Sequence, residues 1–81
     1  MRQRPGPDEA LAAVLREMRE ERDESQEALA HRSGIAAGSL ARIELGQASP
    51  AWATVRQIAR ALNVSMRELS AAVERMDARL S

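Results

Sequence analysis

The chain has 81 residues with 12 arginines, no lysine and 12 acidic residues, so its formal net charge at pH 7 is zero. This length allows one domain with a modest core, and the absence of cysteine excludes disulfide bonds and thiolate metal sites. With no Phe, no Tyr and a single Trp, the core must be built from aliphatic residues, which favours closely packed short helices over a β-sheet.

The first seven residues form a polar segment with two prolines and a glycine, a composition typical of a flexible arm. The segment lacks the apolar stretch of a secretory signal, and no later run approaches the length that spans a membrane. We therefore divide the chain into an arm at 1–7 and a single domain at 8–81. We expect a cytoplasmic protein with no membrane partner.

A first helix is predicted from Asp8, a suitable N-cap, with Glu9 next to the positive end of the helix dipole. Apolar residues recur along it at helical spacing, namely Leu11, Val14, Leu15 and Met18. The charged residues at 20–24 are interpreted as a solvated helix end and loop. An acidic surface that docks a partner is the alternative interpretation.

Residues 25–46 are predicted to form two short helices joined by a tight turn. Ser25 is a suitable N-cap for the first helix, in which Ala28 and Leu29 are expected to face inward. Gly34 is expected to end this helix, because glycine adopts a left-handed backbone conformation without steric cost.

The second helix of the pair has an apolar face formed by Leu40 and Ile43, three residues apart, and Gly46 is expected to end it. Two short helices with a tight turn form a helix-turn-helix. This arrangement presents its second helix to the major groove of DNA.

A fourth helix is predicted after Pro50, which favours a helix start. Its apolar face is expected to bury Trp52, the largest hydrophobic side chain of the sequence, in the core. Ala51 offers no side-chain acceptor to cap this helix, and Asn63 is a suitable left-handed stop.

A capping box formed by Ser65 and Glu68 predicts a last helix at 66–80. Its apolar residues follow one another at spacings of four, three and four, which makes a seam longer than so small a core can use. We therefore expect a homodimer interface on this helix. Its predicted residues are Leu69, Val73, Met76 and Leu80.

Three runs of this sequence resemble the helix-turn-helix of the Cro/C1-type (XRE family) bacterial regulators. The runs are SQEALAHRSGI, SLARIELG and SPAWATVRQIARALNVS, and the resemblance covers roughly residues 11–70. It implies an all-α, five-helix (lambda repressor-like) DNA-binding domain that works as a homodimer on a two-fold operator. It also implies that the second helix braces the phosphate backbone while the third lies in the major groove.

Phosphate contacts are expected where helix ends and loops offer donors. A helix N-terminus presents free N–H groups and a positive dipole end, so Ser25 and Gln26 are expected to anchor a phosphate. In the loop after the third helix, Gln47 and Ser49 are expected to contact phosphates as well. Arg2 and Arg4 of the arm are within reach of a groove, although a frayed terminus is the favoured interpretation.

Base contacts are expected from the third helix, on the positions that match the family's base-facing residues: Ala37, Gly38, Ser39, Ala41 and Arg42. Arg42 is the best direct reader, because a guanidinium can bond bidentately to a guanine edge, whereas an internal ion pair is its alternative role. Glu44 matches a position that braces the domain, so we expect it to be structural.

The charges are unevenly distributed along the chain. Residues 8–27 carry eight acids and three arginines, a net charge of −5, whereas residues 28–67 carry five arginines and one acid, a net charge of +4. The positive portion contains most of the helix-turn-helix. A protein with so few basic groups is expected to bind random DNA weakly.

No catalytic or metal-binding constellation is present, since His31 is the only histidine and no cofactor motif accompanies it. We therefore expect a transcriptional regulator that binds double-stranded DNA, such as a phage-type repressor, a restriction–modification controller or an antitoxin-like autoregulator. The alternative is a protein-interaction module that keeps the fold but binds DNA weakly or only with a partner. Control by a partner protein or by the concentration of the chain is expected rather than control by a small molecule.

Overall fold

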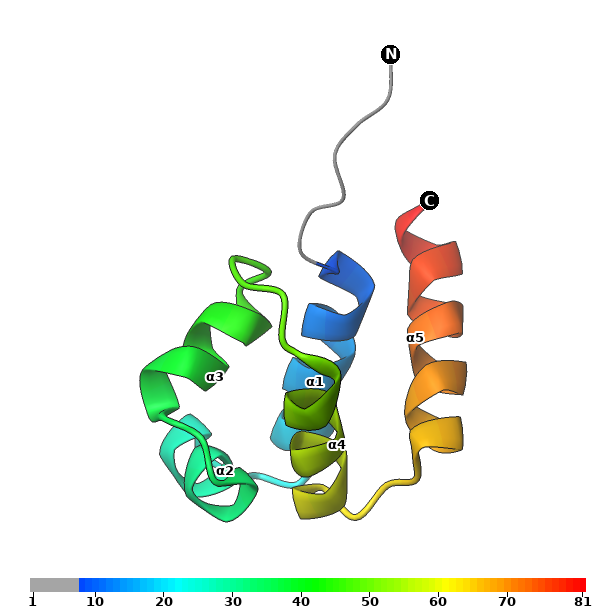
Figure 1. Cartoon of the computed structure of the whole chain (residues 1–81). Coiled ribbons are helices and arrows are strands. Elements are labelled where there is room, and N and C mark those ends of the chain that lie inside the picture. Colours follow the sequence, from blue (N-terminus) through cyan, green and yellow to red (C-terminus); the bar gives the residue numbers. More distant parts are fainter. Residues whose placement is uncertain (1–7) are drawn as a thin grey trace.

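The computed structural model describes residues 8–81, which form five α-helices and contain no strand (Figure 1). Their bounds are α1 Glu9–Glu21, α2 Gln26–Ser33, α3 Ala37–Glu44, α4 Trp52–Ala61 and α5 Met66–Leu80. The predicted all-α, five-helix fold class is confirmed. The predicted arm, with Arg2 and Arg4, lies outside the described residues.

Three helices begin at the capping residues that the sequence predicts. The Asp8 carboxylate accepts the backbone N–H of Leu11 at 2.9 Å, and the Ser25 hydroxyl accepts that of Ala28 at 3.1 Å. At α5, the Ser65 hydroxyl accepts the N–H of Glu68 at 3.0 Å while the Glu68 carboxylate accepts the N–H of Ser65 at 2.9 Å. These helix starts are therefore determined locally.

The predicted helix ends are also found. Gly34 has φ 76° and Gly46 has φ 73°, in the left-handed region that glycine tolerates. Asn63 has φ 61° and follows α4. α4 begins after Ala51 without a side-chain cap, as its alanine predicts, and α3 likewise begins after Ala36 without one.

The core joins all five helices. α1 packs against α3 and α5, and α2 packs against α3 and α4, so α1 and α2 hold the other helices together. Figure 1 shows α3 and α5 on opposite sides of α1 and α4. Burying one aliphatic side chain contributes about 1.5–3 kcal/mol. The largest fully buried side chains are Leu15, Leu29, Leu40, Ile58, Leu62 and Leu69.

Two predicted core residues lie on the surface. Ala28 is exposed, because the buried face of α2 is formed by Leu29, Ala30 and Ser33. Trp52 is 66% exposed, which contradicts its predicted burial. It precedes Val55 by three residues on the apolar face of α4, but it lies in the first turn, where a groove between α1, α4 and α5 stays open.

The apolar seam of α5 is divided between the core and the surface. Leu69 and Met76 are buried within the chain, because α1 packs along α5 and covers their side of the helix. They have almost no surface left for a second protein, so their assignment to a dimer interface needs correction. Val73 is half-buried and Leu80 is exposed, so both remain available.

Candidate nucleic-acid interface

The turn between α2 and α3 sets the geometry of the helix-turn-helix. The backbone N–H of Gly34 donates to the carbonyl of His31 at 3.2 Å, and that of Ile35 donates to the carbonyl of Ala30 at 3.0 Å. These bonds satisfy carbonyls at the end of α2 while the left-handed Gly34 reverses the chain. The half-buried Ile35 then packs against the core, which places α3 across α2.

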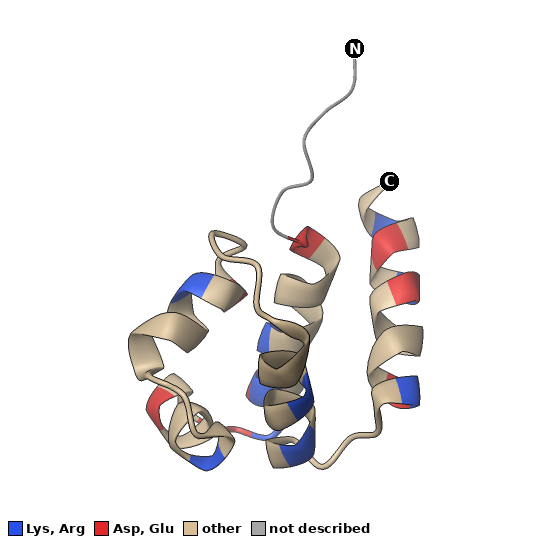
Figure 2. Cartoon of the chain, in the orientation of Figure 1, with Lys and Arg blue, Asp and Glu red and all other residues tan. Residues whose placement is uncertain are grey.

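The outer side of α3 carries the predicted base-reading residues. Gly38 and Arg42 are exposed, and Ala37 and Ser39 are partly exposed, whereas Leu40 faces the core. A Cβ added at Gly38 would meet nothing within 4 Å, so this surface is open. Its small side chains allow the backbone of α3 to approach a ligand closely. Charged positions on α3 are confined to its C-terminal half (Figure 2).

Arg42 is the cation on this surface. It lies in the last turn of α3 and is exposed. Among residues 8–81 it has no ion-pair partner, since the two ion pairs found there are those of Arg19 and Arg32. The internal salt bridge that was the alternative role of Arg42 is therefore not formed within these residues.

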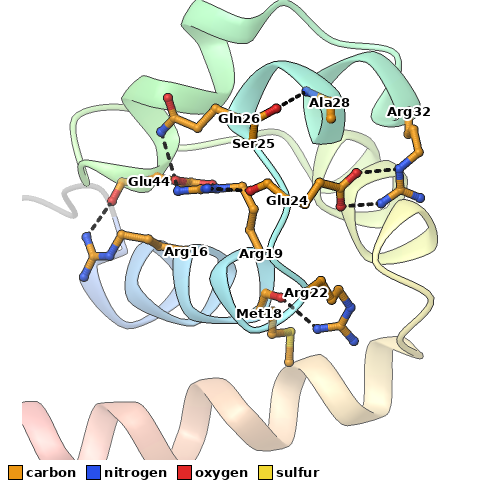
Figure 3. Close-up of polar contacts among 10 residues, drawn as sticks. All are labelled: Arg16, Met18, Arg19, Arg22, Glu24, Ser25, Gln26, Ala28, Arg32 and Glu44. Atoms are coloured by element: carbon orange, nitrogen blue, oxygen red, sulfur yellow. Dashed lines mark hydrogen bonds and ion pairs between the residues drawn. The ribbon is translucent and has the colours of Figure 1, made fainter.

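Glu44 ends α3 and is only 2% exposed, as expected of a bracing residue (Figure 3). Its carboxylate accepts two hydrogen bonds from the Arg19 guanidinium, at 2.8 Å from Nε and 2.9 Å from Nη2. A third comes from the side-chain amide of Gln26 at 3.0 Å. The buried carboxylate thus ties α1 and the start of α2 to the end of α3.

Arg19 is fixed by the same contacts. Its Nη1 also donates to the backbone carbonyl of Glu24 at 2.8 Å, so the guanidinium spans α1, the following loop and α3. The hydrogen bonds that Arg19 donates to the Glu44 carboxylate raise the pKa of Arg19 above its ordinary value, against the opposing effect of burial. Arg19 therefore keeps its charge and braces the helix-turn-helix from inside.

A second ion pair fixes the other end of α2. The Arg32 guanidinium bonds both carboxylate oxygens of Glu24, at 2.7 and 2.6 Å, and donates to the carbonyl of Ala61 at 2.6 Å. The hydrogen bonds from Arg32 hold the pKa of Glu24 below its ordinary value. Arg22 donates to the carbonyl of Leu62 at 3.1 Å. These arginines stabilise the end of α4 and leave Arg42 as the cation of α3.

The predicted phosphate-contact residues lie around α3. Ser25 and Gln26 begin α2, and Gln26 is oriented by its bond to Glu44. Gln47 and Ser49 are exposed in the loop that follows α3, where the backbone N–H of Gln47 donates to the carbonyl of Arg42 at 2.9 Å. The start of α3 also has backbone N–H groups without a side-chain cap, which suit an anionic ligand.

The internal roles of Arg16 and Arg19 were not among the expectations from the sequence. Arg16 Nη1 donates to the backbone carbonyl of Glu44 at 3.4 Å, on the same side of α1 as Arg19. A spacing of three residues places both arginines on one side of a helix, and this spacing is the feature of the sequence that could have indicated a shared role. Residues 8–81 contain no helix that is long and apolar enough to cross a membrane and no group of potential metal ligands.

Comparison with known proteins gives a family and several structural relatives. A family model described as a helix-turn-helix domain matches residues 10–73. A comparison with curated proteins gives no match. The chain is similar to the restriction-modification controller protein C.AhdI from Aeromonas hydrophila, with 33% identity and a TM-score of 0.73 over 75% of this chain and 92% of that protein.

Two further solved structures share the fold. The clp gene regulator ClgR from Corynebacterium glutamicum is 24% identical, with a TM-score of 0.83 over 96% of this chain and 84% of that protein. A variant of the restriction-modification controller protein C.Esp1396I is 19% identical, with a TM-score of 0.86 over 90% of this chain and 95% of that protein. The chain therefore belongs to the helix-turn-helix domain family, as a regulator of the Cro/C1 type and not an enzyme.

Proposed function

We propose that the chain is a sequence-specific transcriptional regulator that acts in the cytoplasm as a homodimer on a two-fold operator in double-stranded DNA, with α3 in the major groove. The exposed Arg42 carries this proposal: it has no ion-pair partner among residues 8–81 and belongs to a helix that the buried Glu44 holds in place. The similarity to C.AhdI, a restriction-modification controller protein, supports the same role.

The proposed contacts divide into positioning and reading. Gln26, Gln47 and Ser49 bind phosphates and fix the position of the domain on the duplex. Arg42 reads a guanine through two hydrogen bonds, and Ser39 adds a weaker polar contact. The small residues Ala37 and Gly38 let α3 approach the bases and accept a thymine methyl group beside it.

We include a homodimer in the proposal because one domain offers only a small surface for reading DNA. A single α3 with one strong reader specifies few base pairs, whereas two copies related by a two-fold axis read two half-sites about 34 Å apart. The remaining selectivity then comes from the spacing and deformability of the uncontacted centre of the operator.

Binding to the DNA upstream of the chain's own gene tests the proposal. Fluorescence anisotropy at a low and a moderate salt concentration should give tighter binding to one palindromic segment than to a shuffled duplex of equal length and composition. Selectivity should persist at the higher salt, because base contacts are screened less than phosphate contacts. Equal binding to the two duplexes at both salt concentrations would contradict sequence-specific recognition.

A protein-interaction module is the second candidate function. It is favoured by the zero net charge and by the internal bonds of Arg19, Arg22 and Arg32, which leave few arginines for phosphates. This candidate predicts that the chain binds no segment of the neighbouring DNA more tightly than the shuffled duplex. The anisotropy measurement therefore decides between the two functions.

A further inference from the structure

The helix α4 differs from the other helices in its charges. Among the five helices of residues 8–81 it alone contains no acidic residue, whereas it carries two arginines, Arg56 and Arg60 (Figure 2). Both are exposed, because Val55, Ile58 and Ala59 form the buried face of the helix. Like charges four residues apart on a helix repel each other and destabilise it. The pair therefore does not contribute to the stability of the fold.

The two arginines of α4 have no ion-pair partner among residues 8–81, where the ion pairs found are those of Arg19 and Arg32. A hollow beside them, between α4 and the start of α5, is lined by one acid of the described residues, Glu68. Its carboxylate already accepts the backbone N–H of Ser65 at 2.9 Å, within the capping box of α5. The outer side of α4 therefore keeps an uncompensated positive charge.

A second pair of exposed arginines has acids of the same chain beside it. Arg75 and Arg79 are also four residues apart, on α5. They line a hollow of about 160 Å³ together with Glu17 and Glu21 of α1. Two acids thus balance the two arginines of α5, whereas the two arginines of α4 share a hollow with one acid. The two pairs have the same spacing and exposure, so they differ chiefly in this compensation.

Arg60 lies between two hollows of the surface. One has a volume of about 480 Å³ and is also lined by Arg56. The other, of about 380 Å³, lies between α4 and the end of α2, where it is lined by His31 and Gln57 and by no acid of the described residues. A cationic ridge with a hollow on each side offers room for the side chains of an elongated segment that lies across it.

We propose that Arg56 and Arg60 bind an acidic helix of a partner protein through carboxylates that lie one helical turn apart. Side chains four residues apart on a helix have Cβ atoms about 5–6 Å apart, so a partner helix with glutamates at this spacing places one carboxylate opposite each guanidinium. Each contact is then a charge-assisted, bidentate pair. A nucleic acid fits less well, because two arginines do not follow a strand and no aromatic side chain lines either hollow for bases to stack on.

This surface is separate from the surface proposed to bind DNA. α4 packs mainly against α2 and α5, whereas α3 packs against α1 and α2 and lies to one side of α4 (Figure 1). A partner on the outer side of α4 therefore leaves α3 uncovered. The inference goes beyond the proposed function, because it gives the chain a contact with a second protein that is compatible with a bound duplex.

A nuclear magnetic resonance titration of the isotope-labelled full chain tests the surface. The probe is a capped, alanine-based helical peptide with a glutamate at every fourth residue along one side. At low salt it should shift the Nε–H signals of Arg56 and Arg60 far more than those of Arg75 and Arg79. The shifts should shrink as salt is raised, because all these charges are exposed. A control peptide with the same residues, ordered so that the glutamates spread over all sides, should bind at least about threefold more weakly.

Removal of the two cations provides the second test. Arg56→Gln/Arg60→Gln should weaken binding of the first peptide by about fivefold or more, because both ion pairs are lost. Arg75→Gln/Arg79→Gln is the matched control, since it removes the same charge from an exposed pair of the same spacing, and it should leave the affinity unchanged. All four arginines are exposed, so circular dichroism should show both variants folded.

Equal weakening by the two double variants would overturn the proposal, because the peptide would then respond only to net charge. A loss of binding to random DNA that is larger in Arg56→Gln/Arg60→Gln than in the control would also overturn it and would assign the surface to a nucleic acid. The proposed function is tested separately by selective DNA binding. A chain that binds the peptide through α4 but binds all duplexes alike supports this inference and contradicts only the proposed function.

Discussion

At the scale of single residues, Arg19 and Arg42 differ in burial and in their hydrogen-bond partners. Arg19 is held by the buried Glu44 through two hydrogen bonds, so its charge is neutralised inside the domain. Arg42 is exposed on α3 and has no partner in the described part of the chain. A guanidinium reads a base only when its donors are free, so Arg42 is the reader that α3 offers.

Replacing Arg42 by Ala should therefore weaken binding to the operator by about 1–3 kcal/mol and weaken binding to random DNA much less. Gln26→Ala should weaken both by a similar factor, because a phosphate contact carries no sequence information. Anisotropy titrations with the two duplexes measure both effects. Arg56→Ala, which removes an exposed arginine of α4 outside the proposed interface, is the control. If Arg42→Ala weakens binding to both duplexes equally, Arg42 contacts a phosphate and not a base.

Removal of the buried carboxylate should destabilise the whole domain. Glu44→Ala leaves the guanidinium of Arg19, whose side chain is 13% exposed, without its partner, and such a loss costs about 3–5 kcal/mol. Urea unfolding followed by circular dichroism measures the change. The double variant Arg19→Met/Glu44→Leu should recover much of the stability, because no buried charge remains.

The exposed pair of Arg32 and Glu24 provides the comparison for this experiment. Solvent screens its charges more than those of the buried pair, so Glu24→Ala should cost less than Glu44→Ala. If both substitutions lower the urea midpoint equally, the buried carboxylate has no special bracing role.

At the scale of elements, helix starts and ends could be predicted because their signals are local. The hydroxyls of Ser25 and Ser65 accept N–H groups three residues later in the chain, and the left-handed Gly34 and Asn63 follow their helices directly. These contacts depend only on neighbouring residues. The candidate surface of α3 follows from the same local pattern, since Leu40 faces the core and leaves Arg42 outside.

The placement of Trp52 and Met76 could not be predicted in the same way. Periodicity shows which face of a helix is apolar, but it does not show how far a neighbouring helix covers that face. α1 extends along α5 and buries Met76, whereas the start of α4 projects beside an open groove and exposes Trp52. The bond between Arg19 and Glu44 likewise joins residues 25 positions apart, which no local signal connects.

The capping box of α5 should make stability depend on pH. The hydrogen bond that the backbone N–H of Ser65 donates to the Glu68 carboxylate is the main cause that holds the pKa of Glu68 below its ordinary value in the folded chain. A lowered folded pKa means that this stabilisation is complete above the unfolded pKa, near 4.5, and is lost as pH falls through the folded pKa. The urea midpoint should therefore fall less between about pH 5 and pH 2 in Glu68→Gln than in the unmodified chain.

Ser65→Ala is the control for this dependence, because it removes the hydroxyl that accepts the Glu68 N–H but keeps the backbone N–H that donates to the Glu68 carboxylate. It should lower stability at neutral pH by about 0.5–2 kcal/mol, as expected for a lost helix cap, and should keep most of the acid limb, because the backbone N–H is the main cause of the lowered pKa. An acid limb that is unchanged in Glu68→Gln would show that Glu68 does not contribute to it.

At the scale of the whole molecule, acidic and basic residues are equal in number, but several of the arginines are bonded within the chain while several of the acids are exposed. Arg19, Arg22 and Arg32 bond to acceptors within the chain and stabilise its fold. Several acids of residues 8–27 remain exposed, among them Glu27 in the first turn of α2, directly after Gln26. The proposed phosphate-binding end of α2 therefore carries its own repulsive charge, which limits affinity for any DNA.

Neutralising this charge should strengthen DNA binding without changing its selectivity. Glu27→Gln removes repulsion from the phosphate at Gln26, so affinity for the operator and for random DNA should both rise by about two- to fivefold at low salt. The ratio of the two affinities should stay constant, because a phosphate does not report sequence. The gain should shrink as salt is raised, since screening weakens the repulsion. Asp77→Asn, which neutralises an exposed acid of α5 on the opposite side of α1 from α3, is the matched control and should change neither affinity. If Glu27→Gln alters the ratio, or Asp77→Asn gives the same gain, the start of α2 is not the local phosphate contact proposed for it.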